Sequence, residues 1–372
     1  MVVACGAPTT EPHAVMERIV FFGKGGIGKS TTASNISATL AADGRRVLHV
    51  GCDPKHDSTV ALLRGTMIQP VVDRIQSLAG LTAESVVTRS HLGVDCVEAG
   101  GPEAGVGCGG RGISRMLEIF QSVNLLSPER YDVCVYDVLG DVVCGGFASP
   151  LRKGIGEKVV IVASEEVMAL YAANNIARAV VHYASNGVSL AGLIVNLRDN
   201  SEDRGPVERF AKLINTKVLG YIPREPLVRE AEYRRMTVAE YAPGAAITRT
   251  LRELGEQILA LDARSLPLPT PLDEQTFYAL TQHRFVVPEG GVGAPKPAAA
   301  EGSAAEGLVA LRRGADDGPE AQEARRRRYE SERRAGVRAV RLGRVSAGEA
   351  LQRLQRAFPR EARELRPADL EA

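Results

Sequence analysis

Short apolar runs alternate with helix-like stretches through the first two thirds of the chain. Five of the runs are rich in β-branched residues and bounded by Gly, Asp or Asn: RIVFFG, RVLHVG, YDVCVYDV, KVVIVA and LAGLIVN. Runs that are apolar at nearly every position are typical of strands buried on both faces of a parallel sheet. The intervening stretch STTASNISATLAADG ends at a glycine, as helices commonly do. The pattern predicts a doubly wound α/β domain with a mostly parallel sheet over residues 18–263.

The pattern changes after Arg264. The stretch SLPLPTPLDEQTF is proline-rich, and EGGVGAPKPAAAEGSAAEG carries too little apolar surface to fold, so we expect residues 264–300 to form an extension and linker. Residues 301–372 form a basic tail that contains EARRRRYESERRAGVRAVRLGRV. We expect this C-terminal extension to be largely disordered, and residues 1–17 to be a flexible N-terminal arm.

One short helix is predicted inside the tail, near residues 346–358. Ser346 and Glu349 form a capping box at its start. Three apolar residues share one face of this helix: Leu351, Leu354 and Phe358. Two interpretations of the tail stay open: a tether that ends in a docking helix, or a solvated and mostly disordered segment.

Composition and charge narrow the functional classes. The chain is 44% hydrophobic and 24% charged, as ordinary globular proteins are, and its formal net charge is +1. That balance predicts no bulk attraction to nucleic acid or to anionic membranes. The N-terminus resembles no signal peptide, and no apolar run is long enough to cross a bilayer, so we expect a cytoplasmic protein. Six cysteines are too few for a disulfide scaffold, which leaves metal ligation or burial as their roles.

A phosphate-binding loop follows the first predicted strand. GKGGIGKST, residues 23–31, satisfies G-x-x-x-x-G-K-[ST] between a strand and a helix, which is the context the motif requires. Its glycines let backbone N–H groups converge on phosphates, Lys29 neutralises the β and γ oxygens, and the Ser30 hydroxyl ligates Mg²⁺. The chain is therefore expected to be a P-loop NTPase.

A second lysine, Lys24, makes this Walker A loop deviant. From inside the loop it cannot easily reach its own γ-phosphate, but it could reach one bound in a facing subunit, as an arginine finger does. Lys24 therefore favours a dimer with two nucleotides near its interface. The alternative is a solvated loop lysine.

Acidic and amide side chains follow three of the predicted strands. Asp53 and Asp57, in GCDPKHDST, could position water or sense Mg²⁺. Asp137, at the end of VCVYD, has the Walker B position that holds the magnesium shell. Asn196 ends another strand, where it either contacts the base or simply terminates the strand. Carboxylates at strand carboxyl ends lie beside the ligand crevice of such sheets.

Two cysteines lie in separate glycine-rich loops, Cys108 in GPEAGVGCGGRGISRM and Cys144 in DVLGDVVCGGFASP. They lack the C-x-x-C spacing that zinc favours, and alone they cannot complete a four-thiolate iron–sulfur cluster. A symmetric dimer could hold such a cluster on its two-fold axis. Because Cys144 and Asp137 share one segment, a movement triggered at the γ-phosphate would pull on the cluster. The remaining cysteines are expected in apolar packing or, for the first, in the mobile arm: Cys52, Cys96, Cys134 and Cys5.

Four motifs in this order resemble the nitrogenase iron protein family: GKGGIGKSTT, CDPKHD, GGPEAGVGCGGRG and YDVLGDVVCGGF. That family includes the ATP-binding subunits of the light-independent protochlorophyllide and chlorophyllide reductases. The resemblance covers residues 18–262. It implies a homodimer that binds two MgATP, carries one 4Fe–4S cluster, takes electrons from a ferredoxin or flavodoxin and passes them singly to a heteromeric catalytic component.

The resemblance also implies roles by position. Residues that would bind the nucleotide are Gly25, Gly26, Ile27, Gly28, Lys29, Ser30, Thr31, Lys55 and Asn196. Residues that would act in hydrolysis and in the two switches are Lys24, Asp53, Asp57, Asp137 and Asp141. Cys108 and Cys144 would hold the cluster. Arg111 corresponds to the family's arginine on the docking face, which is ADP-ribosylated in some bacteria.

Different motifs of the chain resemble different branches of this family. VMALYAANNIARAV and AEYRRMTVAEYAP resemble the nitrogenase branch, CDPKHDST the protochlorophyllide branch, and PLPTPLDEQTF the chlorophyllide branch, from whose loop GGIGKSTT departs. We interpret this mosaic as the iron protein of a nitrogenase or nitrogenase-like complex, such as methylthio-alkane reductase, with a tetrapyrrole reductase as the alternative. An alternative from another class is a ParA/MinD-type ATPase switch without a cluster. A cluster-assembly scaffold would show a C-x-x-C pair, which the chain lacks.

Overall fold

The computed structural model describes two compact units, residues 1–300 and 301–372. In the second unit, helix α13 (Ala347–Ala357) lies where the capping box predicts a helix, with Leu351 and Leu354 buried. Phe358, most of the N-terminal arm, the linker after residue 287 and most of the basic tail lie outside the described residues. The described ranges are 15–75, 80–101, 110–140, 149–152, 154–200, 203–287 and 346–357, with residues 329, 333, 337 and 340.

The first unit is built on an eight-stranded sheet with the order β3-β4-β2-β5-β1-β6-β7-β8. All neighbouring strands are parallel except β3 and β4. The five strands predicted from the apolar runs are present, and β3, β4 and β8 are additional. The strands are β1 Glu17–Phe22, β2 Val47–Cys52, β3 Thr88–Arg89, β4 Asp95–Glu98, β5 Val133–Val138, β6 Lys158–Ala163, β7 Ser189–Asn196 and β8 Val218–Ile222.

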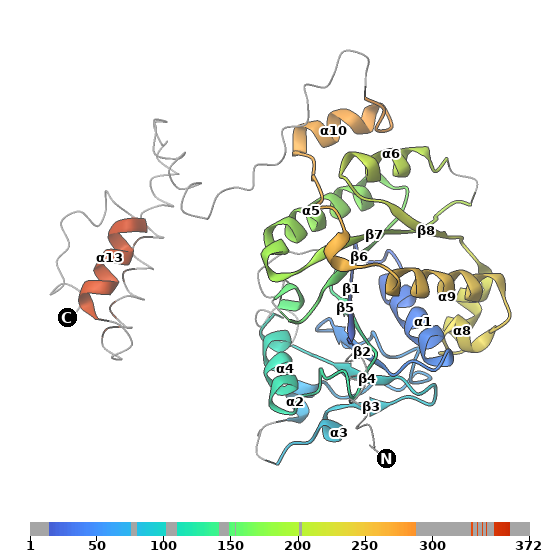
Figure 1. Cartoon of the computed structure of the whole chain (residues 1–372), viewed down its shortest axis with the longest axis horizontal. Helices are drawn as coiled ribbons and strands as arrows, with labels where there is room; N and C mark the ends of the chain where they lie inside the picture. The colour runs from blue at the N-terminus through green and yellow to red at the C-terminus, as the bar shows by residue number, and fades with distance from the viewer. Residues whose placement is uncertain are drawn as a thin grey trace, which may run out of the picture. The chain divides into compact units, whose positions relative to one another are not determined.

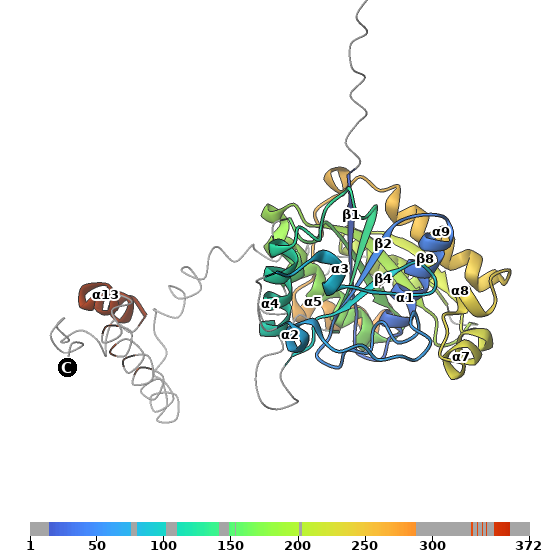
Figure 2. The same ribbon diagram turned by 90° about the horizontal axis from the view of Figure 1, so that it is seen from below.

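Helices cover both faces of this sheet, which confirms the predicted doubly wound α/β fold. α1, α8 and α9 lie on one face, and α4, α5 and α6 on the other (Figures 1 and 2). None of the helices described is both long and apolar enough to span a membrane. The helices are α1 Lys29–Ala42, α2 Val71–Arg74, α3 Ala83–Val86, α4 Gly110–Ser122, α5 Val167–Tyr183, α6 Gly205–Leu213, α7 Pro226–Tyr233, α8 Val238–Tyr241, α9 Ala246–Leu259 and α10 Glu274–Gln282, with short 3₁₀ turns η1 Ser149–Leu151, η2 Ala184–Asn186 and η3 Ala263–Ser265.

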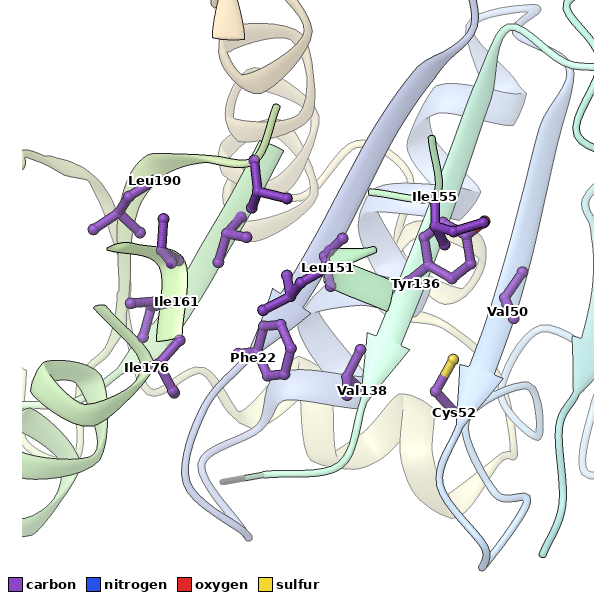
Figure 3. Packing of buried hydrophobic residues seen from close by; sticks show 14 of the residues in the cluster. Phe22, Val50, Cys52, Tyr136, Val138, Leu151, Ile155, Ile161, Ile176 and Leu190 are labelled. Atoms are coloured by element: carbon purple, nitrogen blue, oxygen red, sulfur yellow. The ribbon is translucent and has the colours of Figure 1, made fainter. Parts of the chain in front are cut away.

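The central strand β1 explains why the apolar runs show no polar alternation. Ile19 and Phe21 pack into the core shared with α1 and α9, while Val20 and Phe22 pack into the core on the opposite face. All four side chains are fully buried. Figure 3 shows Phe22 in this second core, beside Leu151 of η1 and between Ile176 of α5 and Val138 of β5. Because successive side chains on a strand point to opposite faces, burial of both faces requires an apolar residue at every position.

Helix α10 was not predicted from the sequence. After η3 the proline-rich stretch is extended, as expected, but it then enters α10, whose Phe277 packs against Phe210 of α6 and against Phe285. Asp273 begins the helix by accepting a hydrogen bond from the Thr276 N–H at 2.9 Å. The packed unit therefore continues past Arg264 to Phe285.

Candidate nucleotide site and switch segments

The P-loop leaves β1 at the carboxyl edge of the sheet, where α/β proteins bind their ligands. Gly26 and Gly28 adopt left-handed φ angles of 74° and 93°. A Cβ atom on Gly28 would lie 2.5 Å from the Asn196 Nδ2, so a larger residue does not fit there. At Gly25 and Gly26 a Cβ atom would meet nothing within 4 Å, which leaves open space beside the loop backbone. These features fit a phosphate cradle.

A buried ion pair joins the P-loop to the Walker B position. Lys29 Nζ donates to Asp137 Oδ1, and the Ser58 hydroxyl donates to Asp137 Oδ2 at 2.5 Å. Burial alone would raise the pKa of Asp137, but the Lys29 charge and hydrogen bonds from Lys29, Ser30 and Ser58 outweigh burial and hold that pKa below its usual value. Asp137 is therefore ionised, although only 1% of its surface is exposed.

His49 extends this pair into a longer chain of hydrogen bonds. It lies on β2, fully buried, with Nε2 2.9 Å from the Ser58 Oγ and Nδ1 2.8 Å from the Ser37 Oγ. Burial lowers the pKa of His49 to about 4, so the ring is neutral at physiological pH. Sequence reasoning missed His49 and Ser58. The available signal was a histidine inside the otherwise apolar run RVLHVG.

A second buried acid, Glu98, holds the residue after Ser58. Its Oε1 accepts hydrogen bonds from the backbone N–H and the hydroxyl of Thr59, each at 2.8 Å. Its Oε2 is buried and has no hydrogen-bond partner among the described residues. Burial raises the pKa of Glu98 to about 8, so this carboxyl is protonated at neutral pH. Glu98 was also missed, although it ends a strand at the carboxyl edge of the sheet, as Asp137 does.

The predicted first-switch residues form a turn beside these anchors. The Asp53 carboxylate accepts a hydrogen bond from the Lys55 N–H at 3.0 Å, and His56 adopts a left-handed φ of 45°. Lys55 and Asp57 are exposed. Their predicted roles toward water, Mg²⁺ and nucleotide stay predictions.

Asn196 lies between the P-loop and a cavity. Its Nδ2 donates to the Ile27 carbonyl at 2.8 Å, and its buried Oδ1 has no partner among the described residues. The cavity has a volume of about 450 Å³ and is lined by the start of α1, the end of β7 and residues of α7, including Pro226 and Arg229. Its size and its place beside the P-loop fit a nucleoside. Thr31 also lines it and donates to Glu232 at 3.2 Å.

Gly140, which lies between the predicted second-switch residues Asp137 and Asp141, lies directly against the P-loop. Its carbonyl accepts a hydrogen bond from the Gly23 N–H at 3.4 Å, and a Cβ atom there would lie 2.8 Å from the Gly25 nitrogen. Asp141 and Cys144, which follow it, lie outside the described residues.

The described elements that follow the two cysteine loops, α4 and η1, lie side by side. Cys108 also lies outside the described residues, but Ser114 of α4 is 3.4 Å from Ser149 of η1. These serines follow the Cys108 and the Cys144 loops respectively. Arg111 is exposed in the first turn of α4, just after the Cys108 loop.

The cysteines that the structure does describe are Cys52, Cys96 and Cys134, all fully buried and free. Burial raises the pKa of each thiol, so all three stay protonated and serve as packing residues. Cys5 lies outside the described residues.

Comparison with known proteins decides the family. Residues 17–286 match the family described as 4Fe-4S iron sulfur cluster binding proteins, NifH/frxC family. The chain belongs to this family. It is 45% identical over 264 residues to the nitrogenase iron protein of Methanospirillum hungatei JF-1, covering 70% of this chain and 93% of that protein. It is 42% identical over 270 residues to the nitrogenase iron protein of Methanococcus voltae, covering 72% of this chain and 96% of that protein.

A more distant likeness concerns the fold alone. The cell division ATPase MinD of Pyrococcus furiosus superimposes with a TM-score of 0.54 at 21% identity, over 66% of this chain and 100% of that chain.

The family match and the two nitrogenase iron proteins confirm, at the level of the family, the resemblance drawn from the four motifs. The chain is a nitrogenase-iron-protein-like, ATP-dependent 4Fe–4S reductase component.

Proposed function

We propose that the chain works as a cytoplasmic homodimer that couples MgATP hydrolysis to single-electron transfer into the catalytic component of a nitrogenase or nitrogenase-like complex. The observation that carries the coupling is the contact of Gly140 with Gly23 and Gly25. Because Gly140 begins the segment that bears Cys144, a change in the P-loop backbone moves the start of the cysteine loop. A switch of this kind needs such a shared element.

Nucleotide binding exchanges the partners of the buried ion pair. With MgATP bound, Lys29 would pair with the phosphate oxygens instead of Asp137, the Ser30 hydroxyl would ligate the ion, and Asp137 would hold water of the magnesium shell. Lys29 holds the pKa of Asp137 low while the two are paired. With nucleotide bound, the magnesium ion would supply the positive charge that keeps this buried carboxylate ionised. Asn196 and the neighbouring cavity take the nucleoside.

Lys24 acts on the nucleotide of the facing subunit. It is only partly buried, and its side chain makes no hydrogen bond or ion pair with another described residue. A lysine held ready in this way fits a trans-acting role, in which it stabilises charge on the transferred phosphoryl group. Asp53, Asp57 and Asp141 act with it in water positioning and in the two switches.

Cys108 and Cys144 of both subunits hold one 4Fe–4S cluster. The proximity of Ser114 and Ser149 supports this ligand set, since the elements that follow the two loops lie next to each other. Held there, the cluster would supply single-electron redox chemistry, with a ferredoxin or flavodoxin as the electron donor. Arg111 lies on the face that docks the partner. The two relatives are both named nitrogenase iron protein, which favours a nitrogenase-type partner over a tetrapyrrole reductase.

The ligand assignment is tested with Cys144→Ala, purified without oxygen. We expect this variant to lose its iron and its visible absorption while still binding ATP, because the P-loop is unchanged. Cys5→Ala is the matched control and keeps both. A Cys144→Ala protein with a full cluster spectrum would refute the ligand set.

A further inference from the structure

The strand β2 carries one polar side chain that the proposed chemistry does not use. His49 is fully buried, yet both of its ring nitrogens have partners, and these partners come from different parts of the chain. Ser37 belongs to α1, which begins at the P-loop. Ser58 belongs to the segment that follows Asp53 and Asp57.

The donor and the acceptor of every hydrogen bond in the series Ser37–His49–Ser58–Asp137 can be assigned. Asp137 is ionised and can only accept, so the Ser58 hydroxyl uses its single proton on Asp137. The Ser58 oxygen must then accept from His49 Nε2–H. His49 Nδ1, which carries no proton in that tautomer, accepts from the Ser37 hydroxyl. Each donor and acceptor is matched once, and no other order satisfies all four groups.

This series of hydrogen bonds holds Ser58, at the carboxyl end of the first switch, against the buried core. Without the His49 N–H, the Ser58 hydroxyl could rotate away, and the link between the first switch and Asp137 would be lost. Thr59, the next residue, is held separately by Glu98. Two buried groups therefore hold the carboxyl end of the first switch. Glu98 holds Thr59, and the His49–Asp137 pair holds Ser58. Asp137 is also the carboxylate that is proposed to change partner when nucleotide binds.

We propose that His49 is a positioning residue that holds Ser58 against Asp137 and thereby couples the first switch to the magnesium-holding carboxylate. Its ring nitrogens contact Ser37 and Ser58, and it acts through Ser58. The proposal rests on the proposed function, since it concerns the switch that responds to ATP.

Two substitutions at position 49 and one at position 37 separate coupling from mere packing. Glutamine at position 49 can donate an N–H to Ser58 and accept from Ser37, whereas leucine fills the space and does neither. Ser37→Ala removes only the donor to His49 Nδ1, within a helix that tolerates alanine well. If His49→Leu fails to fold, the proposal is tested with Ser37→Ala alone, by the same two measurements.

The first readout is tryptic cleavage after the exposed Lys55 in nucleotide-free protein, followed by mass spectrometry. We expect cleavage about tenfold faster in His49→Leu, the factor that corresponds to one lost buried hydrogen bond. His49→Gln should stay within about twofold of the parent, and Ser37→Ala should lie between. Cleavage after Lys217, in the turn before β8, is the internal control and should not change. Equal acceleration at both sites, or none at Lys55, would overturn the proposal.

The second readout is steady-state ATP hydrolysis at saturating Mg²⁺. We expect kcat to fall about tenfold in His49→Leu with KM for ATP nearly unchanged, and to be restored in His49→Gln. A parental kcat in His49→Leu, or a Gln variant that folds but is as slow as the Leu variant, would contradict coupling. Iron content is measured in each sample. A parent protein without iron refutes the proposed function, whereas unchanged kinetics in iron-loaded His49→Leu refutes only the role of His49.

Discussion

The region at the carboxyl ends of β2, β4 and β5 and the region between α5, α6 and α10 are held together by opposite kinds of contact. The first consists of buried polar groups, with Asp137 between Lys29 and Ser58. The second is aromatic, with Phe277 packed against Phe210 and Tyr171. A buried hydrogen bond or ion pair can be exchanged for one to a ligand at small net cost, whereas lost apolar burial has no such replacement. The first region is therefore suited to switching and the second to holding the scaffold.

The largest effect is expected from breaking the buried ion pair. Lys29→Ala leaves the Asp137 charge unpaired, so the free energy of unfolding should fall by about 3–5 kcal/mol and ATP hydrolysis by at least about a hundredfold. Chemical denaturation and an ATPase assay measure the two effects. In Lys29→Ala/Asp137→Asn the stability should recover and the activity should not. A single variant as stable as the parent would show that the pair is not desolvated as described.

The aromatic region should respond in stability alone. Phe277→Ala should lower the free energy of unfolding by about 3 kcal/mol, because it removes a fully buried ring from the core. ATP affinity of the folded protein should not change. Tyr278→Ala, at a position 41% exposed, is the matched control and should cost much less. A change in nucleotide affinity that exceeds the change in stability would contradict the division between switch and scaffold.

Glu98 should make stability depend on pH in an unusual direction. Its pKa is about 8 in the folded protein and 4.5 in the unfolded chain, so folding favours the protonated form. That contribution is complete below pH 4.5 and is lost as pH rises toward 8. Glu98→Gln lacks this loss, so its stability relative to the parent should increase across that range, by a few kcal/mol in order of magnitude. Thermal unfolding at several pH values tests this. Exposed Glu118→Gln should show no such trend, and a parallel pH profile for Glu98→Gln and the parent would exclude a protonated Glu98.

The smallest predicted effect concerns the start of α10. Asp273→Ala removes the acceptor for the Thr276 N–H and should cost about 1 kcal/mol of stability. Asp273→Asn keeps an acceptor at the same place and should be close to the parent in urea denaturation. If both variants lose the same stability, the contribution of Asp273 is its charge and not the cap.

Much of the scaffold was predictable because it depends on local pattern. Strands buried on both faces, such as β1 and β6, have a continuous apolar sequence, and the P-loop motif carries its own context. Strand β4, with the short sequence DCVE, lacks such a run. Helix α10 could not be predicted, because its apolar face becomes evident only when Phe277 meets Phe210, which lies far away in sequence.

The sequence predicted the motif residues of the candidate site but not the hydrogen bonds that join them to other side chains. Lys29, Asp137 and Asn196 each belong to a recognisable motif or strand end. The chain through His49 and Ser58 joins two strands, a helix and a loop, and no sequence spacing indicates which side chains meet. Burial then sets their protonation, which also depends on the assembled fold.

The central claim is that nucleotide state and cluster are coupled through the P-loop and the Gly140 segment. The most direct test is to purify the protein without oxygen and to record absorbance and EPR spectra of the reduced form, with and without MgATP. The account predicts a broad visible iron–sulfur band and an EPR signal that MgATP alters, with the alteration reduced in Gly140→Ala, where the added Cβ crowds the P-loop. An iron-free, colourless dimer, or a cluster signal that MgATP leaves unchanged, would contradict it.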